Sequence, residues 1–334
     1  MANLNRELGI DLGTDFTVFA ENGEVLLHEP TTVAILLDEW KMIEWGQAAK
    51  DMYGRVPDDI EVVNPIQHGV IADYEITENL LRYLVQKICG SMVLFRPKLM
   101  VSVPCNITSV ESRAVHEAGI GAGSREVYLI QQPLAAAIGI DLPIAPPSGN
   151  MVISLGGGTN QAAVMAMNSI ISSGMEKTGG QVMDDDIISF IRKNYGVILG
   201  NSTAETAKMR IGAALLEEEQ LFMDVQGQDQ VSGLPRTITI KTEDIVEALQ
   251  DSLKAIVKLV KRVLEKTPPE LVSDVMDRGV ALTGGGTQLR GIDRYLTRQL
   301  GIPAYLVDNP TTCTALGASK ALGMMDELKR AIVQ

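Results

Sequence analysis

Hydrophobic residues in this chain gather in short runs that alternate with longer amphipathic stretches. Apolar runs at residues 17–20, 33–37, 99–103, 127–130, 162–167 and 280–283 predict buried strands. Apolar residues spaced three or four apart predict helices over residues 77–88 and from residue 242 to about 263. Strands that alternate with helices are typical of α/β layers, in which helices cover both faces of a sheet.

Two further apolar stretches lead into the same kind of glycine-rich turn, and the predicted strands at 17–20 and 162–167 follow these turns. The first turn lies in the sequence Ile-Asp-Leu-Gly-Thr at residues 10–14, and the second lies in Ile-Ser-Leu-Gly-Gly-Gly-Thr at residues 153–159. Glycine lets the backbone approach phosphate oxygens closely, and successive amide groups form a concavity that binds anions. Ordinary hairpin turns also use Gly and Thr. Two copies with matching apolar flanks favour two similar half-molecules that hold one polyphosphate between them.

Other punctuation along the chain supports a duplicated organisation. Residues 141–150 are rich in proline and predict a linker directly before the second glycine turn. A third glycine run, residues 284–286, follows the strand at 280–283. The polar stretch up to Pro65 predicts a small inserted subdomain of short strands and a helix. Thr108 and Glu111 form a capping-box pattern that opens a helix reaching about Gly119.

Composition narrows the class of protein. The 334 residues are long enough for two sizeable domains, and 46% are hydrophobic. A net charge of −13 argues against binding to nucleic acid, which needs a basic surface. Three cysteines, an odd number, indicate a reducing compartment, and three scattered histidines argue against a histidine-rich metal site. No secretory signal or membrane-spanning run is visible, so we expect a soluble cytosolic protein.

With these features in place, the chain resembles the actin-like ATPases, and most closely the MreB family of bacterial filament proteins. The resemblance runs nearly end to end and includes residues 69–74, 133–139, 266–271 and 282–286. It implies an actin-like α/β fold of two duplicated ribonuclease-H-like lobes around a nucleotide cleft, each with a smaller inserted subdomain. The expected divisions are residues 1–34, 69–147 and 316–334 (IA), 35–68 (IB), 148–186 and 246–315 (IIA), and 187–245 (IIB).

The resemblance also implies the residues that bind ATP or ADP with Mg²⁺. Asp11, Gly13 and Thr14 of the first hairpin are expected at the phosphates, and Asp11 is expected to reach Mg²⁺ through water. Glu205 and Lys208, one helical turn apart, are expected at the nucleoside; the alternatives are that Glu205 is the capping-box partner of Ser202 and that Lys208 is a surface charge. The other expected nucleotide-binding residues are Asp15, Phe16, Gly156, Gly157, Gly158, Thr159, Gly180, Gly284, Gly285, Gly286 and Gln288.

The chain departs from the family pattern where hydrolysis takes place. Ser154 stands where family members usually carry Asp, and Gln132 stands where bacterial members carry Glu; these are the two expected catalytic positions. Residues 15–16, 160–161 and 181–182 also differ from the usual pairs. Serine and glutamine offer dipoles rather than a full charge to Mg²⁺ and water. We therefore expect nucleotide binding to persist and hydrolysis to be weakened, unless Asp15 or Asp184 compensates.

A short loop predicts membrane contact. Residues 90–98 have an apolar centre, Val93, Leu94 and Phe95, followed by Arg96 and Lys98. The resemblance implies that the apolar residues insert into the bilayer interface while the two cations meet lipid phosphates. The alternative is that the apolar residues continue into the core strand that follows.

The resemblance finally implies partners and location. The expected assembly is a homopolymer of paired protofilaments on the inner face of the cell membrane, involved in cell-shape determination. MreB paralogues and cell-wall elongation proteins are the further partners that the resemblance suggests. The alternatives are a pseudo-ATPase paralogue that co-assembles with another MreB, a small-molecule kinase of the same superfamily, and a chaperone ATPase.

Overall fold

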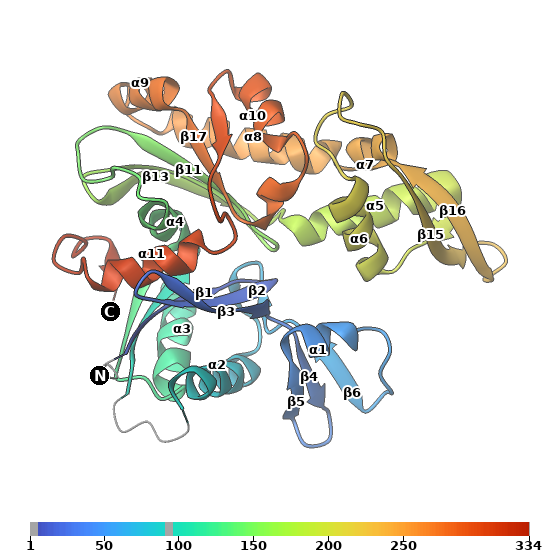
Figure 1. Ribbon diagram of the computed structural model, residues 1–334, viewed down its shortest axis with the longest axis horizontal. Helices are drawn as coiled ribbons and strands as arrows, with labels where there is room; N and C mark the ends of the chain where they lie inside the picture. Colours follow the sequence, from blue (N-terminus) through green and yellow to red (C-terminus); the bar gives the residue numbers. More distant parts are fainter. Residues whose placement is uncertain (1–5, 91–95, 334) are drawn as a thin grey trace.

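The computed structural model describes residues 6–90 and 96–333 and has two large lobes stacked one above the other (Figure 1). The first lobe is built on a six-stranded sheet in the order β19-β10-β9-β1-β2-β3. Helices α2 (Tyr74–Cys89) and α3 (Ser109–Gly121) pack on one face of this sheet. The strands are β1 (Glu7–Leu12), β2 (Phe16–Glu21), β3 (Glu24–Pro30), β9 (Lys98–Val103), β10 (Glu126–Gln131) and β19 (Ile332–Val333).

The second lobe repeats this plan in a five-stranded sheet, ordered β13-β12-β11-β17-β18. In both lobes an antiparallel hairpin comes first, β1–β2 or β11–β12, and its first strand pairs in parallel with a later strand, β9 or β17. The lobes are therefore duplicates, as the sequence predicts. The strands are β11 (Asn150–Leu155), β12 (Asn160–Ala166), β13 (Ser169–Glu176), β17 (Val280–Thr283) and β18 (Ala304–Leu306).

Each lobe carries a smaller sheet, and both small sheets lie toward the same side of the molecule (Figure 1). In the first lobe, β4 (Val33–Leu36), β5 (Lys41–Trp45) and β6 (Ile60–Val63) lie beside α1 (Gly46–Asp51). In the second, β14 (Val197–Ile198), β15 (Phe222–Asp229) and β16 (Pro235–Lys241) lie beside α6 (Asn201–Ile211). The short strands and helix predicted before Pro65 are thus confirmed, while the residue boundaries of the four subdomains stay a prediction.

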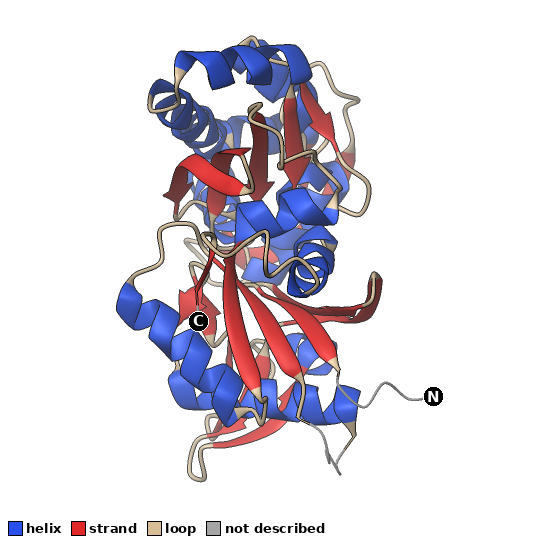
Figure 2. Ribbon diagram, turned by 90° about the vertical axis from the view of Figure 1, so that its left-hand side faces the viewer, coloured by secondary structure: helices blue, strands red, loops and turns tan. Residues whose placement is uncertain are grey.

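Two short helices join the lobes at the centre of the molecule. α4 (Gln132–Gly139) and α11 (Cys313–Leu322) share one hydrophobic cluster with buried residues of both large sheets, among them Met100 and Val152. Figure 2 shows helices between the strands of the upper and the lower lobe. The backbones of the two helices are in contact at Gly317. A Cβ atom there would lie 1.7 Å from the backbone oxygen of Ala135, so a residue with a side chain could not occupy this position without a shift.

The long helix predicted after Thr242 is two helices, α7 (Thr242–Ala248) and α8 (Gln250–Glu265). They meet at Leu249, whose backbone, with φ −84° and ψ −2°, departs from regular α-helical values. Leu249 and Leu253 are both buried, so the hydrophobic stripe reports burial correctly but does not reveal the bend. The capping box of Thr108 and Glu111 is confirmed at the start of α3.

The remaining elements belong to both lobes. Within residues 6–90 and 96–333, each helix is too short or too polar to span a bilayer. The linker predicted at residues 141–150 connects α4 to β11. The elements not yet described are β7 (Ile66–Gln67), β8 (Val70–Ile71), α5 (Gly180–Tyr195), α9 (Pro269–Arg278), the 3₁₀ helix η1 (Gly285–Gln288) and α10 (Ile292–Leu300).

Replacing Gly317 by alanine tests the central helix contact. A methyl group has no space between α11 and α4, so Gly317→Ala should lower the free energy of unfolding by about 3 kcal/mol. Gly323→Ala is the matched control because its new Cβ atom would find the nearest atom, the backbone oxygen of Lys320, at 3.5 Å. Urea denaturation of both variants gives the comparison. Equal stability of the two would show that the crossing relaxes freely.

Candidate functional site

The two glycine hairpins meet between the lobes. The turns are closed in the same way: the amide of Gly13 donates to the oxygen of Phe16 at 3.0 Å, and that of Gly156 to the oxygen of Thr159 at 2.9 Å. A Cβ atom on Gly158 would lie only 2.3 Å from Oγ1 of Thr14. The hairpins are therefore in direct contact, and the absence of a side chain on the second permits it.

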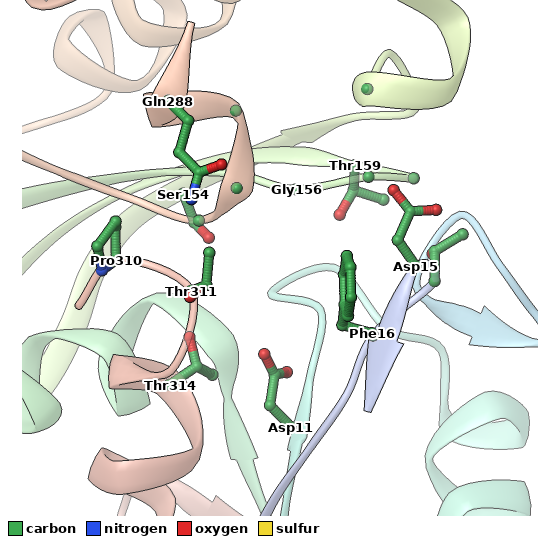
Figure 3. A pocket seen from close by; sticks show the side chains of 18 of the residues that line it. Asp11, Asp15, Phe16, Ser154, Gly156, Thr159, Gln288, Pro310, Thr311 and Thr314 are labelled. Atoms are coloured by element: carbon green, nitrogen blue, oxygen red, sulfur yellow. The ribbon is translucent and has the colours of Figure 1, made fainter. Parts of the chain in front are cut away.

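A cavity of about 500 Å³ opens beside this contact. Every residue that the sequence analysis places at the nucleotide or in catalysis, from Asp11 to Gln288, lines it, and Figure 3 shows ten cavity residues by label. The apolar loop residues Val93, Leu94 and Phe95 lie outside the described residues. Cavity residues that the sequence analysis did not single out are His28, Gln47, Lys50, Gly69, Met183, Met209, Leu289, Pro310, Thr311 and Thr314.

The hairpins present unused backbone donors to this cavity. In the part of the chain that the structure describes, the amide groups of Thr14, Asp15, Gly157 and Gly158 donate no hydrogen bond. All four residues line the cavity. Neighbouring amides without acceptors form a concavity that suits an anion. The geometry thus provides two donor surfaces, one from each lobe, for the same ligand.

Asp11 is held by a chain of polar side chains on the first-lobe wall of the cavity. The hydroxyl of Ser102 donates to Oδ1 of Asp11 at 2.6 Å, and Nε2 of Gln132 donates to the same oxygen at 3.2 Å. Nε2 of Gln161 in turn donates to Oε1 of Gln132. Burial raises the pKa of Asp11, while the bonds from Ser102 and Gln132 oppose that rise. The two amides fix one another, so Gln132 is oriented by its neighbours.

Ser154, the other predicted catalytic residue, lies on the second lobe. It is in β11, in register with Gln161 of β12 and with Thr283 of β17. Figure 3 shows Ser154 on the side of the cavity that Gln288 occupies, away from Asp15. Ser154 and Gln132 therefore reach the cavity from different lobes.

Glu205 and Lys208 have roles that the alternatives drawn from the sequence do not explain. α6 begins at Asn201 after Gly200, so Ser202 lies inside the helix and the capping-box alternative for Glu205 is wrong. Glu205 instead pairs with Lys50 of the first lobe at 2.9 Å. Lys208 is mostly buried and donates to Asp184 at 2.8 Å and to the oxygen of Gly180 at 2.7 Å, so it is not a surface charge.

Some cavity residues had little or no signal in the sequence. Lys50 reaches Glu205 across 155 positions of the chain, and nothing near Lys50 indicates that pairing. Gly69 has a recognisable reason: its φ is +78°, and its amide donates to Oγ1 of Thr14 at 3.0 Å. Pro310 and Thr311 precede α11 in an Asn-Pro turn, which marks a loop but not a cavity wall.

Lys98, one of the two cations expected to meet lipid phosphates, lies close to two carboxylates of its own chain. Lys98 begins β9, and its ammonium lies 3.9 Å from a carboxylate oxygen of Glu7 and 3.7 Å from one of Glu126. These carboxylates weaken its attraction for lipid phosphates. Arg96 is exposed.

With this geometry established, comparison with known proteins identifies the family. A profile described as "MreB/Mbl protein" matches residues 5–330. The chain belongs to the MreB/Mbl family. It is 40% identical over 326 residues to the "Cell shape-determining protein Mbl" of Bacillus subtilis (strain 168), covering 97% of this chain and 98% of that protein. It is 42% identical over 328 residues to the "Cell shape-determining protein MreB" of Escherichia coli (strain K12), covering 96% of this chain and 94% of that protein.

Solved structures of related proteins confirm the actin-like fold. MreB5 of Spiroplasma citri, in a crystal structure described as bound to AMPPNP, superimposes with a TM-score of 0.92 at 30% identity and covers 98% of both chains. The structure described as the "MamK double helical filament" gives 0.77 at 16% identity, covering 96% of this chain and 99% of that one. The second likeness supports the fold alone.

The pair of Asp184 and Lys208 beside the cavity makes stability depend on pH. Burial raises the pKa of Asp184 from 3.8 to about 6, although Lys208 opposes the shift. The folded protein therefore binds this proton more tightly than the unfolded chain, and the contribution of Asp184 to stability falls as the pH rises from about 4 to about 6.

We expect Asp184→Asn to remove this dependence. The free energy of unfolding of the variant, relative to wild type, should rise by about 2–3 kcal/mol between pH 4 and pH 7. Urea denaturation at several pH values measures it, with Asp185→Asn, an exposed neighbour, as control. A constant difference between Asp184→Asn and wild type would contradict the assignment.

Proposed function

We propose that this MreB/Mbl family member binds ATP or ADP between its two glycine hairpins and assembles into filaments that take part in cell-shape determination. The observation that carries the proposal is the contact of two hairpins from different lobes, whose unpaired amides line one cavity. Related proteins support it, since the Spiroplasma citri MreB5 structures are described as bound to AMPPNP and to ADP. The Bacillus subtilis and Escherichia coli relatives are named cell shape-determining proteins.

The nucleotide-binding roles follow from position in the cavity. The amides of Thr14, Asp15, Gly157 and Gly158 suit the phosphates from opposite lobes, since none of them donates a hydrogen bond within the described residues. The glycine turn at 284–286, with Gln288, suits the nucleoside because Gly285 leaves open space where a side chain would otherwise stand. Glu205 offers a carboxylate for ribose hydroxyls, and Lys208, beside Gly180, offers a cation.

Mg²⁺ fits this donor set only as a hydrated ion. Among the described residues, no cluster of three or more His, Cys, Asp or Glu side chains has the arrangement of a metal site. Mg²⁺ commonly keeps several waters and binds through one or two carboxylates together with substrate phosphates. Asp11 supplies such a carboxylate: Ser102 and Gln132 share its Oδ1, which leaves Oδ2 for a water ligand. The ion would balance the charge of the phosphates.

The same residues suggest that hydrolysis is slow. The amide of Gln132 is neutral, and its oxygen already accepts a hydrogen bond from Gln161. It can orient a water molecule only weakly and cannot take its proton. Ser154 presents a hydroxyl where a carboxylate would order water around the metal. Removal of one such electrostatic group commonly lowers a rate by about 10²-fold.

Membrane association at the inner face of the cell membrane forms part of the proposal. Its basis is the apolar sequence Val93-Leu94-Phe95 followed by exposed Arg96. A single short apolar loop binds weakly, whereas a filament repeats it and gains avidity. Paired protofilaments and contacts with other MreB proteins or cell-wall elongation proteins rest on the family alone.

Restoring the missing carboxylates tests the hydrolysis proposal. The double variant Gln132→Glu with Ser154→Asp should raise the single-turnover rate of ATP hydrolysis by about 10²-fold over wild type. Ser109→Asp, on the exposed start of α3, is the matched control and should leave the rate unchanged. Wild-type hydrolysis as fast as that of Bacillus subtilis Mbl in a parallel assay, and abolished by Asp11→Ala, would refute weak hydrolysis.

Sedimentation with electron microscopy tests the filament. Pure protein with Mg²⁺ and AMPPNP should pellet as filaments and should also pellet with liposomes of anionic phospholipid. Leu94→Ser with Phe95→Ser should abolish liposome binding and leave lipid-free pelleting intact, which is the internal control. Polymer that forms only with an added MreB would favour a pseudo-ATPase paralogue. A soluble protein that phosphorylates a small acceptor would favour a kinase.

A further inference from the structure

Asp15 projects from the first hairpin into the second lobe. Nε2 of Gln181, near the start of α5, donates to Oδ1 of Asp15 at 2.7 Å. A Cβ atom on Gly157 would lie 1.8 Å from Oδ2 of Asp15, so the carboxylate rests directly on the glycine backbone of the second hairpin. Figure 3 shows Asp15 beside Thr159, on the opposite side of the cavity from Ser154. A side chain of one lobe thus lies on the anion-binding turn of the other.

The surroundings of this carboxylate have mixed charge. Lys208 of α6 and Lys50 of α1 attract it, while Glu205 of α6 repels it. Asp184 of α5 also faces it closely enough for the Asp15 charge to raise the pKa of Asp184. Burial raises the pKa of Asp15, and the bond from Gln181 opposes that rise. The carboxylate has lost much of its water, so its repulsion of another anion is poorly screened.

We propose that the Asp15 carboxylate is an internal anion of the phosphate cradle, which competes with the nucleotide phosphates and makes binding weaker as the negative charge of the nucleotide increases. The inference rests on the proposed nucleotide site. Asp15 leans on Gly157, whose amide donates no hydrogen bond within the described residues. A phosphate that takes this amide must approach or displace the carboxylate. Like charges at such short range disfavour one another strongly at a poorly solvated site.

The competing interpretation makes Asp15 a substitute ligand for Mg²⁺ in place of the missing carboxylate at Ser154. The contacts favour competition instead. One oxygen of Asp15 accepts the Gln181 amide and the other rests on Gly157. Asp11, which accepts hydrogen bonds from Ser102 and Gln132, lies apart from Asp15 in the cavity (Figure 3). The two interpretations predict opposite changes in nucleotide affinity when the charge is removed.

Asp15→Asn is the decisive variant because it keeps the shape of the side chain and an oxygen that accepts the Gln181 bond. Calorimetric titration of wild type and variant with adenosine, Mg²⁺–ADP and Mg²⁺–AMPPNP gives the comparison. The variant should bind Mg²⁺–AMPPNP at least tenfold more tightly, Mg²⁺–ADP more tightly by a smaller factor, and adenosine equally. Asp185→Asn removes a charge from the exposed face of α5, outside the cavity, and should change each affinity by less than twofold.

Asp15→Ala, with circular dichroism of each protein, guards against a folding defect in the first variant. Measurable binding of Mg²⁺–AMPPNP by Asp15→Asn or Asp15→Ala, where wild type binds it poorly, would support the inference. Equal affinities in wild type and Asp15→Asn would overturn the inference while leaving the nucleotide site intact. Weaker binding by Asp15→Asn only in the presence of Mg²⁺ would overturn it in favour of a metal ligand. Failure of wild type and both variants to bind any nucleotide would overturn the proposed function itself.

Discussion

The close approach of two glycine turns is the contact on which the rest of the site depends. Thr14 packs against Gly158 at a distance that leaves no space for a side chain, and Asp15 does the same against Gly157. The duplicated sheets aim these turns at each other, because each turn follows the first strand of its sheet. Backbone amides from both lobes consequently share one cavity. A larger residue at either glycine would separate the lobes and divide the donor surface.

Phosphate binding and water activation depend on different groups around this contact. Backbone amides attract phosphates whatever the side chains are, so phosphate binding does not require a carboxylate at residue 132 or 154. Water activation does depend on such groups, and Gln132 and Gln161 instead satisfy each other through neutral amides. Asp15 adds a negative charge at the turn itself. The cavity thus combines a backbone cradle with neutral side chains at residues 132 and 154 and a carboxylate at residue 15.

Local signals in the sequence predicted more than long-range ones. The two hairpins and the capping box at Thr108 were predictable because neighbouring residues determine them. The Lys50–Glu205 pair was not, since it joins separate lobes, and the capping alternative for Glu205 failed because Gly200, rather than Ser202, precedes the helix. The bend at Leu249 left no trace because the buried stripe continues through it. The family resemblance, and not the periodicity of the sequence, predicted that Glu205 and Lys208 lie at the cavity.

The central pair of helices has a mechanical consequence. α4 and α11 cross with backbone contact at Gly317, within one hydrophobic cluster that includes both large sheets. Packed interiors resist deformation, so relative rotation of the lobes has its pivot at this crossing. Displacement then grows with distance from the pivot and is larger at the small sheets than at the central helices, and the partly buried Lys50–Glu205 ion pair joins the two lobes at the cavity. With this crossing as a stiff hinge, a small rotation of one lobe against the other would move the small sheets further than the hairpins.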